Sequence, residues 1–130
     1  MGEPKSKQPV ERFMTATLHC IGIDQTLETA HVLMRKHQVR HLPVLEGGKL
    51  VGMVSERDLA LVESLPGVER DAITVEEAMS VDVFTVSPEA PLSEVASQMA
   101  ENKFGSAVVA NGDKVLGVFT TTDALRALVI

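Results

Sequence analysis

One motif that could form a binding site occurs twice in the chain. Residues 52–58 read Gly-Met-Val-Ser-Glu-Arg-Asp, and residues 117–123 read Gly-Val-Phe-Thr-Thr-Thr-Asp. Both follow the pattern Gly-x-x-Ser/Thr-x-x-Asp. A hydroxyl and a carboxylate at this spacing can cap the start of a helix. They can equally hold a ligand, because a hydroxyl donates to an anion and a carboxylate accepts from paired hydroxyls such as a ribose diol. The spacing leaves both interpretations open.

The two motifs belong to a longer internal repeat. With a shift of 65 positions, residues 10–65 align with residues 75–130 without a gap, and ten of the 56 pairs are identical. The identical pairs include Met14 with Met79 and the motif glycines Gly52 with Gly117. The shift is constant, and the alternation of apolar residues recurs at the same shift. We therefore interpret the chain as a tandem repeat of one unit.

Each copy predicts the element order β-α-β-β-α, with the motif between the last strand and the last helix. Apolar residues at helical spacing predict the first helix of each copy, from Leu27 and from Leu92. Gly-Gly and Asn-Gly dipeptides favour a hairpin, because glycine adopts positive φ without steric cost. The expected strands are residues 18–23, 41–45 and 50–54, then 81–86, 107–110 and 115–119; the closing helices are 58–64 and 123–129.

The chain outside the copies is short and polar. Residues 1–9 are expected to form a disordered arm, and residues 66–74 a linker between a first repeat at 10–65 and a second at 75–130. A unit of this size buries little surface alone. We therefore expect the copies to pack by their sheets into one pseudo-two-fold α/β (α+β) domain with a shared core.

Composition argues against several classes of function. The net charge is −6, with eight basic and eight acidic residues in residues 1–65 but four and ten in residues 66–130. This charge, and an aromatic content of 3%, argue against a nucleic-acid partner. No apolar run approaches the ~20 residues of a membrane helix, and the start of the chain does not resemble a signal peptide. A cytoplasmic protein is the expectation.

Catalytic and metal chemistry find little support in the residues. The single cysteine, Cys20, has no motif context for a nucleophile, and the histidines show no metal-ligand spacing with it. The motif hydroxyls have no neighbouring base. We expect no enzyme activity, no catalytic residues and no metal site.

The sequence around the motifs resembles the CBS-domain pair, or Bateman module, in its stand-alone tandem form. The resemblance spans about residues 10–130. It is carried by Val-Arg-His-Leu-Pro-Val-Leu at 39–45, Gly-Gly-Lys-Leu-Val-Gly-Met-Val-Ser-Glu-Arg-Asp-Leu at 47–59, Phe-Thr-Val-Ser-Pro at 84–88, and Lys-Val-Leu-Gly-Val-Phe-Thr-Thr-Thr-Asp-Ala-Leu at 114–125. It implies a regulatory module that binds an adenosine-containing ligand in clefts between the repeats and signals to a partner protein, whose identity stays unknown.

The resemblance also implies which residues line the two clefts. One cleft would combine Val118, Thr120, Thr122 and Asp123 with Leu18, His19, Val39, Arg40 and His41. The other would combine Met53, Ser55, Arg57 and Asp58 with Val83, Phe84, Phe104 and Gly105. Because Arg40 and His41 suit a phosphate, the Asp123 cleft is the one expected to hold a phosphorylated nucleotide. The Asp58 cleft is left to a less charged adenosyl compound, to a nucleotide helped by Arg57, or to no ligand.

The implied ligands are regulatory rather than required cofactors: AMP, ADP, ATP, S-adenosylmethionine or NAD. A homodimer through the paired helices is also implied, with Ala60, Leu61, Ala124 and Leu125 as candidates for its face. The alternative is a ligand-free dimerisation or scaffold module in which the motif residues only cap helices. Simpler roles also stand: His41 on the surface, Phe84 and Phe104 either in the core or beside an adenine ring, and Met34, Met53, Met79 and Met99 in the core.

Overall fold

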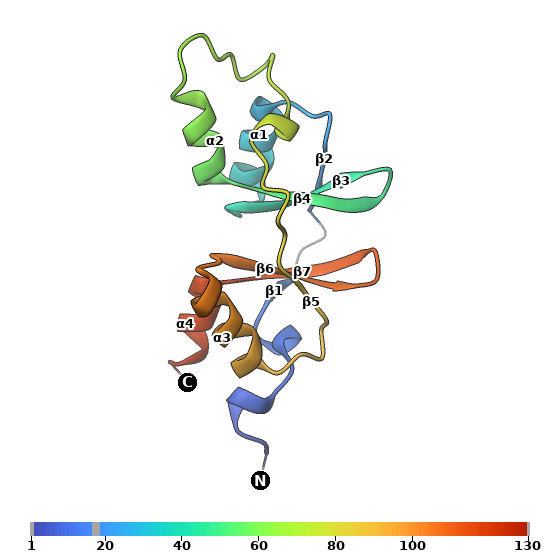
Figure 1. Ribbon diagram of the computed structural model, residues 1–130, viewed down its shortest axis with the longest axis vertical. Coiled ribbons are helices and arrows are strands. Elements are labelled where there is room, and N and C mark those ends of the chain that lie inside the picture. Colours follow the sequence, from blue (N-terminus) through green and yellow to red (C-terminus); the bar gives the residue numbers. More distant parts are fainter. Residues whose placement is uncertain (1, 17–18, 130) are drawn as a thin grey trace. The chain divides into compact units, whose positions relative to one another are not determined.

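The structure is a computed structural model that describes residues 2–16 and 19–129 (Figure 1). The chain divides into two compact units. Unit 1 combines the N-terminal part, up to residue 18, with residues 84–130, and unit 2 is residues 19–83. This division differs from the two sequence copies, because the segment that leads each copy belongs to the unit built from the rest of the other copy.

Unit 2 is a three-stranded sheet with two helices. Strand order is β2-β3-β4, with β2 parallel to β3 and β3 antiparallel to β4. Helices α1 and α2 lie on the same side of this sheet (Figure 1). The elements are β2 (Ile21–Gly22), α1 (Leu27–His37), β3 (His41–Glu46), β4 (Lys49–Ser55), α2 (Glu56–Glu63) and the 3-10 turn η3 (Val75–Glu77).

Unit 1 repeats this plan with one more strand. Its sheet has the order β1-β7-β6-β5; β5 runs parallel to β6, and the other pairs are antiparallel. The elements are the 3-10 turns η1 (Lys5–Lys7) and η2 (Val10–Arg12), then β1 (Thr15–Ala16), β5 (Thr85–Val86), α3 (Leu92–Asn102), β6 (Ser106–Asn111), β7 (Lys114–Thr120) and α4 (Thr121–Ala127).

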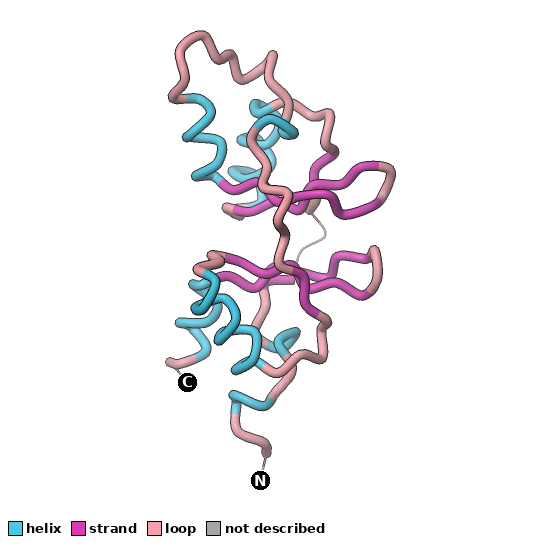
Figure 2. Tube along the Cα trace, in the orientation of Figure 1, coloured by secondary structure: helices cyan, strands magenta, loops and turns pink. Residues whose placement is uncertain are grey.

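The predicted tandem β-α-β-β-α order is confirmed (Figure 2). Both predicted hairpins form, and the glycines in their turns adopt the positive φ that the dipeptides indicated: 58° at Gly47, 82° at Gly48 and 63° at Gly112. The closing helices begin two residues earlier than expected, because the motif hydroxyls act as their N-caps.

Each unit has its own hydrophobic core. In unit 2 the fully buried side chains include Leu27, Leu42 and Leu59, and in unit 1 they include Phe119 and Val95. The expectation of one shared core therefore differs from the two clusters that the described residues form. The methionines lie where predicted: Met34, Met53 and Met99 are buried, and Met79 packs against the unit 2 core.

Each unit is completed by a leading segment, and we define these two segments as residues 5–16 and 70–81. The Leu27 amide at the start of α1 donates to the Ile73 carbonyl at 2.9 Å, and the Leu92 amide at the start of α3 donates to the Gln8 carbonyl, also at 2.9 Å. These pairs are equivalent under the 65-residue shift. Each leading segment thus satisfies a helix-start amide that would otherwise lack a partner. The first leading segment overlaps the expected disordered arm, and within it residues 5–7 form the 3-10 turn η1.

The motif glycines explain how closely the leading segments approach the sheets. A Cβ on Gly52 would lie 2.6 Å from Met79 Sδ and 2.9 Å from the Ser80 carbonyl oxygen. A Cβ on Gly117 would lie 2.6 Å from the Thr15 carbonyl oxygen and 2.7 Å from Met14 Sδ. The matched glycines and methionines of the sequence repeat are therefore contact partners in each unit.

A polar cluster joins the second leading segment to helices α1 and α2 of the same unit. Glu63 at the end of α2 contacts His31 Nε2 of α1 at 2.6 Å and the Arg70 Nε of the linker. Burial acts to raise the pKa of Glu63, but hydrogen bonds and charges from His31 and Arg70 outweigh it, so that the pKa lies below its ordinary value. The counterparts in the second copy, Ala96 and Leu128, are apolar, so the described residues of unit 1 contain no equivalent cluster.

Replacing Glu63 with glutamine is expected to lower the free energy of unfolding at pH 7 by about 1–2 kcal/mol, because charged hydrogen bonds to a partly buried group are lost. A carboxyl with a lowered folded pKa stabilises the protein above its unfolded pKa and loses this effect as the pH falls through its folded pKa. The difference between variant and wild type should therefore shrink below about pH 4. Urea unfolding at several pH values measures it, with exposed Glu28→Gln as control. A pH-independent difference would contradict the cluster's role.

Candidate functional site

In unit 2 the motif forms a capping box at the start of α2. The Asp58 amide donates to Ser55 Oγ at 3.1 Å, and the Ser55 amide donates to Asp58 Oδ2 at 2.9 Å. Among the described residues, no other group donates to the Asp58 carboxylate, and its side chain is half-buried. One carboxylate oxygen, Oδ1, therefore keeps its acceptor capacity.

In unit 1 the same box forms at the start of α4, but its carboxylate is surrounded by donors. The Asp123 amide donates to Thr120 Oγ1 at 3.2 Å, and the Thr120 amide donates to Asp123 Oδ2 at 3.0 Å. The hydroxyl of Thr15 in β1 lies 3.1 Å from Asp123 Oδ1 and 3.3 Å from Oδ2. Arg126 Nη1 is 3.4 Å from Oδ1. Asp123 is only 3% exposed, and it is the one buried charged residue among those described.

The capping interpretation of the motif is thus confirmed in both copies. It also leaves few helix amides for an anion. The first amide of α2, on Glu56, donates to the Arg40 carbonyl at 2.9 Å, and the first amide of α4, on Thr121, donates to the Gly105 carbonyl at 3.2 Å. A ligand at these helix starts would therefore bind mainly to the side chains of the motif rather than to backbone amides.

Within each unit, the hairpin register places part of the predicted site beside the motif. His41 is paired with Ser55 across β3 and β4, so Arg40 and His41 lie next to the Asp58 motif. Ser106 is paired with Thr120 in the same way, which brings Phe104 and Gly105 next to the Asp123 motif. The predicted clefts combine these residues with the motif of the other copy. Those combinations join residues of different units and stay a prediction.

The remaining predicted residues have varied surroundings. Met53 and Val118 are buried, Val39 and Val83 are half-buried, and Arg57 and Thr122 are exposed. Leu18 lies outside the described residues.

Three predicted site residues take part in ring stacks. His19 stacks on His37 with ring centroids 3.4 Å apart, and burial, the charge of His19 and the charge of Lys36 lower the pKa of His37. Phe84 and Phe104 stack on each other at 5.2 Å and pack against the unit 1 core, and His41 is half-buried. The two phenylalanines therefore already contribute to the packing of unit 1.

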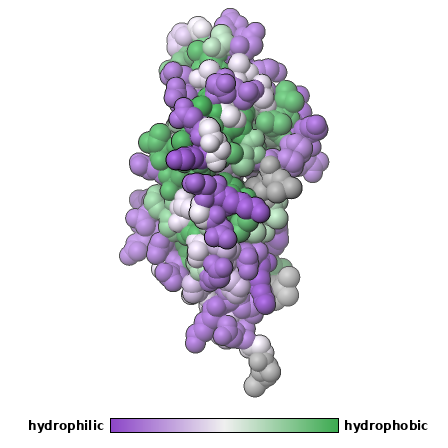
Figure 3. All heavy atoms as spheres, turned by 90° about the vertical axis from the view of Figure 1, so that its right-hand side faces the viewer, coloured by the Kyte–Doolittle hydropathy of each residue, from purple (hydrophilic) through white to green (hydrophobic). Residues whose placement is uncertain are grey.

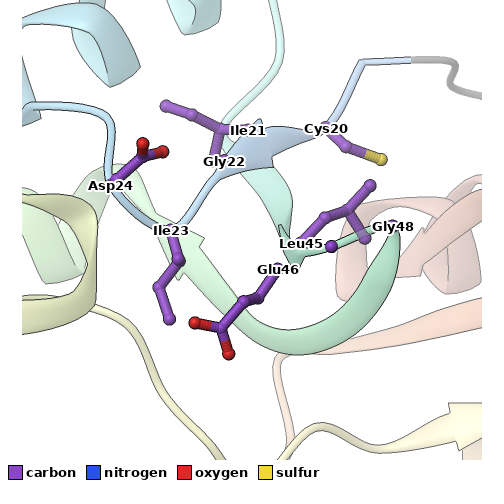
Figure 4. Close-up of a pocket in the computed structure, with 9 residues that line it drawn as sticks. Cys20, Ile21, Gly22, Ile23, Asp24, Leu45, Glu46 and Gly48 are labelled. Carbon is purple, nitrogen blue, oxygen red and sulfur yellow. The ribbon is translucent and has the colours of Figure 1, made fainter.

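A pocket of about 480 Å³ lies in unit 2, between β2 and the β3–β4 turn. It is lined by residues 20–24 and 45–48, none of which the sequence analysis selected as a ligand contact. Figure 4 shows the Cys20 thiol and the Asp24 and Glu46 carboxylates pointing in different directions. Burial raises the pKa of the Cys20 thiol, which disfavours the nucleophilic thiolate. These side chains do not converge on one ligand position.

The described part of the chain contains no group of three or more metal-ligating side chains. It also contains no helix of the length and apolarity that crossing a membrane requires. On the face drawn in Figure 3, hydrophilic side chains are widespread and hydrophobic ones show between them in smaller groups.

Two β-α-β-β-α units define the class of tandem CBS folds. In each unit the last helix begins with a capping box built on Gly-x-x-Ser/Thr-x-x-Asp. The chain belongs to the CBS-domain family, whose sequence profile, described as "CBS domain", matches it twice, at residues 10–64 and 75–130.

Similar proteins agree with this assignment. The chain is 30% identical over 115 residues to the CBS domain-containing protein YhcV of Bacillus subtilis, covering 88% of this chain and 81% of that protein. It is similar to an uncharacterised conserved protein from Pyrococcus horikoshii, with TM-score 0.82, 29% identity and coverage of 96% and 95% of the two chains. It is also similar to CBSX2, whose crystal structure is a complex with AMP, with TM-score 0.79, 26% identity and coverage of 93% and 96%.

Proposed function

We propose that this protein is a regulatory module that binds an adenosine-containing ligand through its two motifs and passes the resulting change to a partner protein. The single observation that carries the proposal is the repeated pairing of a hydroxyl with a carboxylate at a strand-to-helix junction. A carboxylate there can accept from a ribose diol while keeping its cap. The similarity to CBSX2, crystallised with AMP, supports adenosine as the ligand class.

The cations near the Asp58 motif support a phosphorylated ligand. The Arg40 carbonyl accepts from the first amide of α2, so this residue adjoins the motif, and Arg57 lies within it. Both side chains are exposed. An exposed guanidinium can approach a phosphate with two parallel hydrogen bonds, which favours AMP, ADP or ATP over uncharged adenosine.

The proposal includes a sensing role rather than catalysis, and a homodimer. The residues that the family profile matches, 10–64 and 75–130, contain both motifs. The helices α2 and α4 each carry an exposed leucine, Leu61 and Leu125, both 61% exposed. These two exposed leucines, on equivalent helices, are the side chains that we propose for pairing with a second copy.

Thermal unfolding with millimolar ligand tests the proposal. AMP is expected to raise the melting temperature, because a ligand that binds only the folded state stabilises it, by ~2.7 kcal/mol at one hundred times the dissociation constant. Arg40→Ala should weaken the binding of AMP more than the binding of adenosine. Arg35→Ala, at an exposed position on α1, should leave the binding of both ligands unchanged.

Two results would count against the proposal or part of it. If Arg40→Ala reduces the affinity for AMP and the affinity for adenosine equally, the placement of Arg40 at the phosphate is contradicted. If AMP, ADP, ATP, S-adenosylmethionine and NAD all leave the melting temperature unchanged, the ligand-free scaffold is the better description.

A further inference from the structure

We propose that the two motif carboxylates are not equivalent: Asp58 is open to the diol of a ligand, whereas Thr15 holds Asp123 in a closed state. This inference rests on the proposed function and narrows it: in the wild-type protein the Asp58 motif binds the ligand and the Asp123 motif does not. It also assigns to Thr15, which lies outside both motifs, the role of deciding whether the second motif binds at all.

The closed state of Asp123 is defined by its contacts. Both of its carboxylate oxygens lie within 3.3 Å of the Thr15 hydroxyl, Oδ1 also faces Arg126, and Oδ2 also accepts from the Thr120 amide at 3.0 Å and faces the Thr120 hydroxyl at 3.2 Å. With 3% of its surface exposed, this carboxylate has little access to further donors.

The counterpart of Thr15 in unit 2 is Ser80, and the two occupy matching backbone positions. Thr15 is paired with Val118 in β7. Ser80 is bridged to Met53 in β4, where the Met53 amide donates to the Ser80 carbonyl at 3.0 Å and the Ser80 amide donates to the Met53 carbonyl at 2.8 Å. Although the backbone placement matches, no hydrogen bond joins the Ser80 hydroxyl to Asp58 among the described residues, and Asp58 accepts only from the Ser55 amide. The side-chain contact, rather than the fold, distinguishes the two motifs.

A vicinal diol offers two donors and needs two acceptor positions on a carboxylate. Asp58 Oδ1 is unused, so a diol can bind there without displacing a protein group. At Asp123 the diol must first displace the Thr15 hydroxyl, and because Thr15 belongs to β1, this displacement acts on the edge strand of the unit 1 sheet.

The positive side chains also differ between the two motifs: the cation beside Asp123, Arg126, already faces its carboxylate. Arg40 and Arg57 adjoin the Asp58 motif, while the equivalent positions beside Asp123 are Gly105 and Thr122. Whereas the family resemblance implies a phosphorylated nucleotide at the Asp123 cleft, the contacts inside each unit favour the Asp58 motif in this proposal.

Isothermal titration of the full chain with AMP tests the inference. Wild type is expected to bind one equivalent. Asp58→Ala should raise the dissociation constant at least tenfold, whereas Asp123→Ala should change it less than twofold. The opposite ranking, or two equivalents bound by wild type, overturns the inference and leaves the proposed function standing. The absence of binding by AMP and by every other adenosine compound overturns both.

Variants of Thr15 test its role separately. Thr15→Val keeps the side-chain shape and removes the hydroxyl, and it should increase bound AMP from one to two equivalents. Thr15→Ser and Ser80→Ala should both stay at one equivalent, because the first keeps the hydroxyl and the second removes one that does not contact Asp58. Circular dichroism verifies folding, and a folded Thr15→Val that still binds one equivalent overturns the role of Thr15. If that variant does not fold, the ranking of Asp58→Ala and Asp123→Ala decides.

Discussion

Replacing Gly117 with alanine is expected to lower the free energy of unfolding by about 1–3 kcal/mol, the usual cost of forcing an extra methyl into a packed site. The new Cβ would lie 2.6 Å from the Thr15 carbonyl oxygen and 3.2 Å from Ala16 Cα. Both are backbone atoms of β1, which no side-chain rotation can move away. The strand pairing of Thr15 with Val118 must therefore shift, and the Thr15–Asp123 hydrogen bond shifts with it.

Two other glycines provide the comparison for this variant. Gly52→Ala should cost less than Gly117→Ala, because its nearest contact is the flexible Met79 side chain, although the Ser80 carbonyl is also close. Gly105→Ala should be nearly neutral, since a Cβ there meets nothing within 4 Å. Urea unfolding followed by circular dichroism measures all three. A Gly117→Ala protein as stable as Gly105→Ala would contradict the close packing of β1 on β7.

Asp123→Ala is expected to lower the free energy of unfolding by about 2–4 kcal/mol, the second large effect. The substitution removes the N-cap partner of α4, worth about 1 kcal/mol. It also removes the acceptor of the Thr120 amide and of the hydroxyl of Thr15, an exposed residue, and the loss of these charge-assisted hydrogen bonds costs about 1–3 kcal/mol more. The burial of Asp123 makes this loss larger than at an exposed cap.

Asp58→Ala is the matched control, because it removes the same capping box from α2. Asp58 accepts from one amide and is half-buried, so the expected cost is about 1 kcal/mol. Chemical unfolding of both variants without ligand gives the comparison. Equal costs would show that the Thr15 and Arg126 contacts add nothing to the cap.

Much of the fold follows from local pattern. The spacing of apolar residues from Leu27 and Leu92 indicates α1 and α3, and the Gly-Gly and Asn-Gly turns indicate the hairpins, because helix period and turn geometry depend on neighbouring residues. The capping boxes follow from the same short-range logic. The repeat itself is visible only because both copies keep the same residue types at one constant shift.

Long-range contacts decided the rest. That residues 5–16 complete unit 1 and residues 70–81 complete unit 2 depends on packing between segments far apart in the chain, which no local pattern records. The matched Gly117 and Met14 hinted at such an approach, but their contact is evident only once β1 lies on β7.

The same distinction applies to the motif that looked equivalent in both copies. The sequence alone determined that a hydroxyl and a carboxylate recur at a strand-to-helix junction, since three residues of spacing are enough for a cap. Tertiary structure alone decided that the Thr15 hydroxyl reaches Asp123 while Ser80 makes no such bond to Asp58. The physical reason is that a carboxylate's free acceptor capacity depends on every donor around it, and the decisive donor here is 108 residues away in the chain.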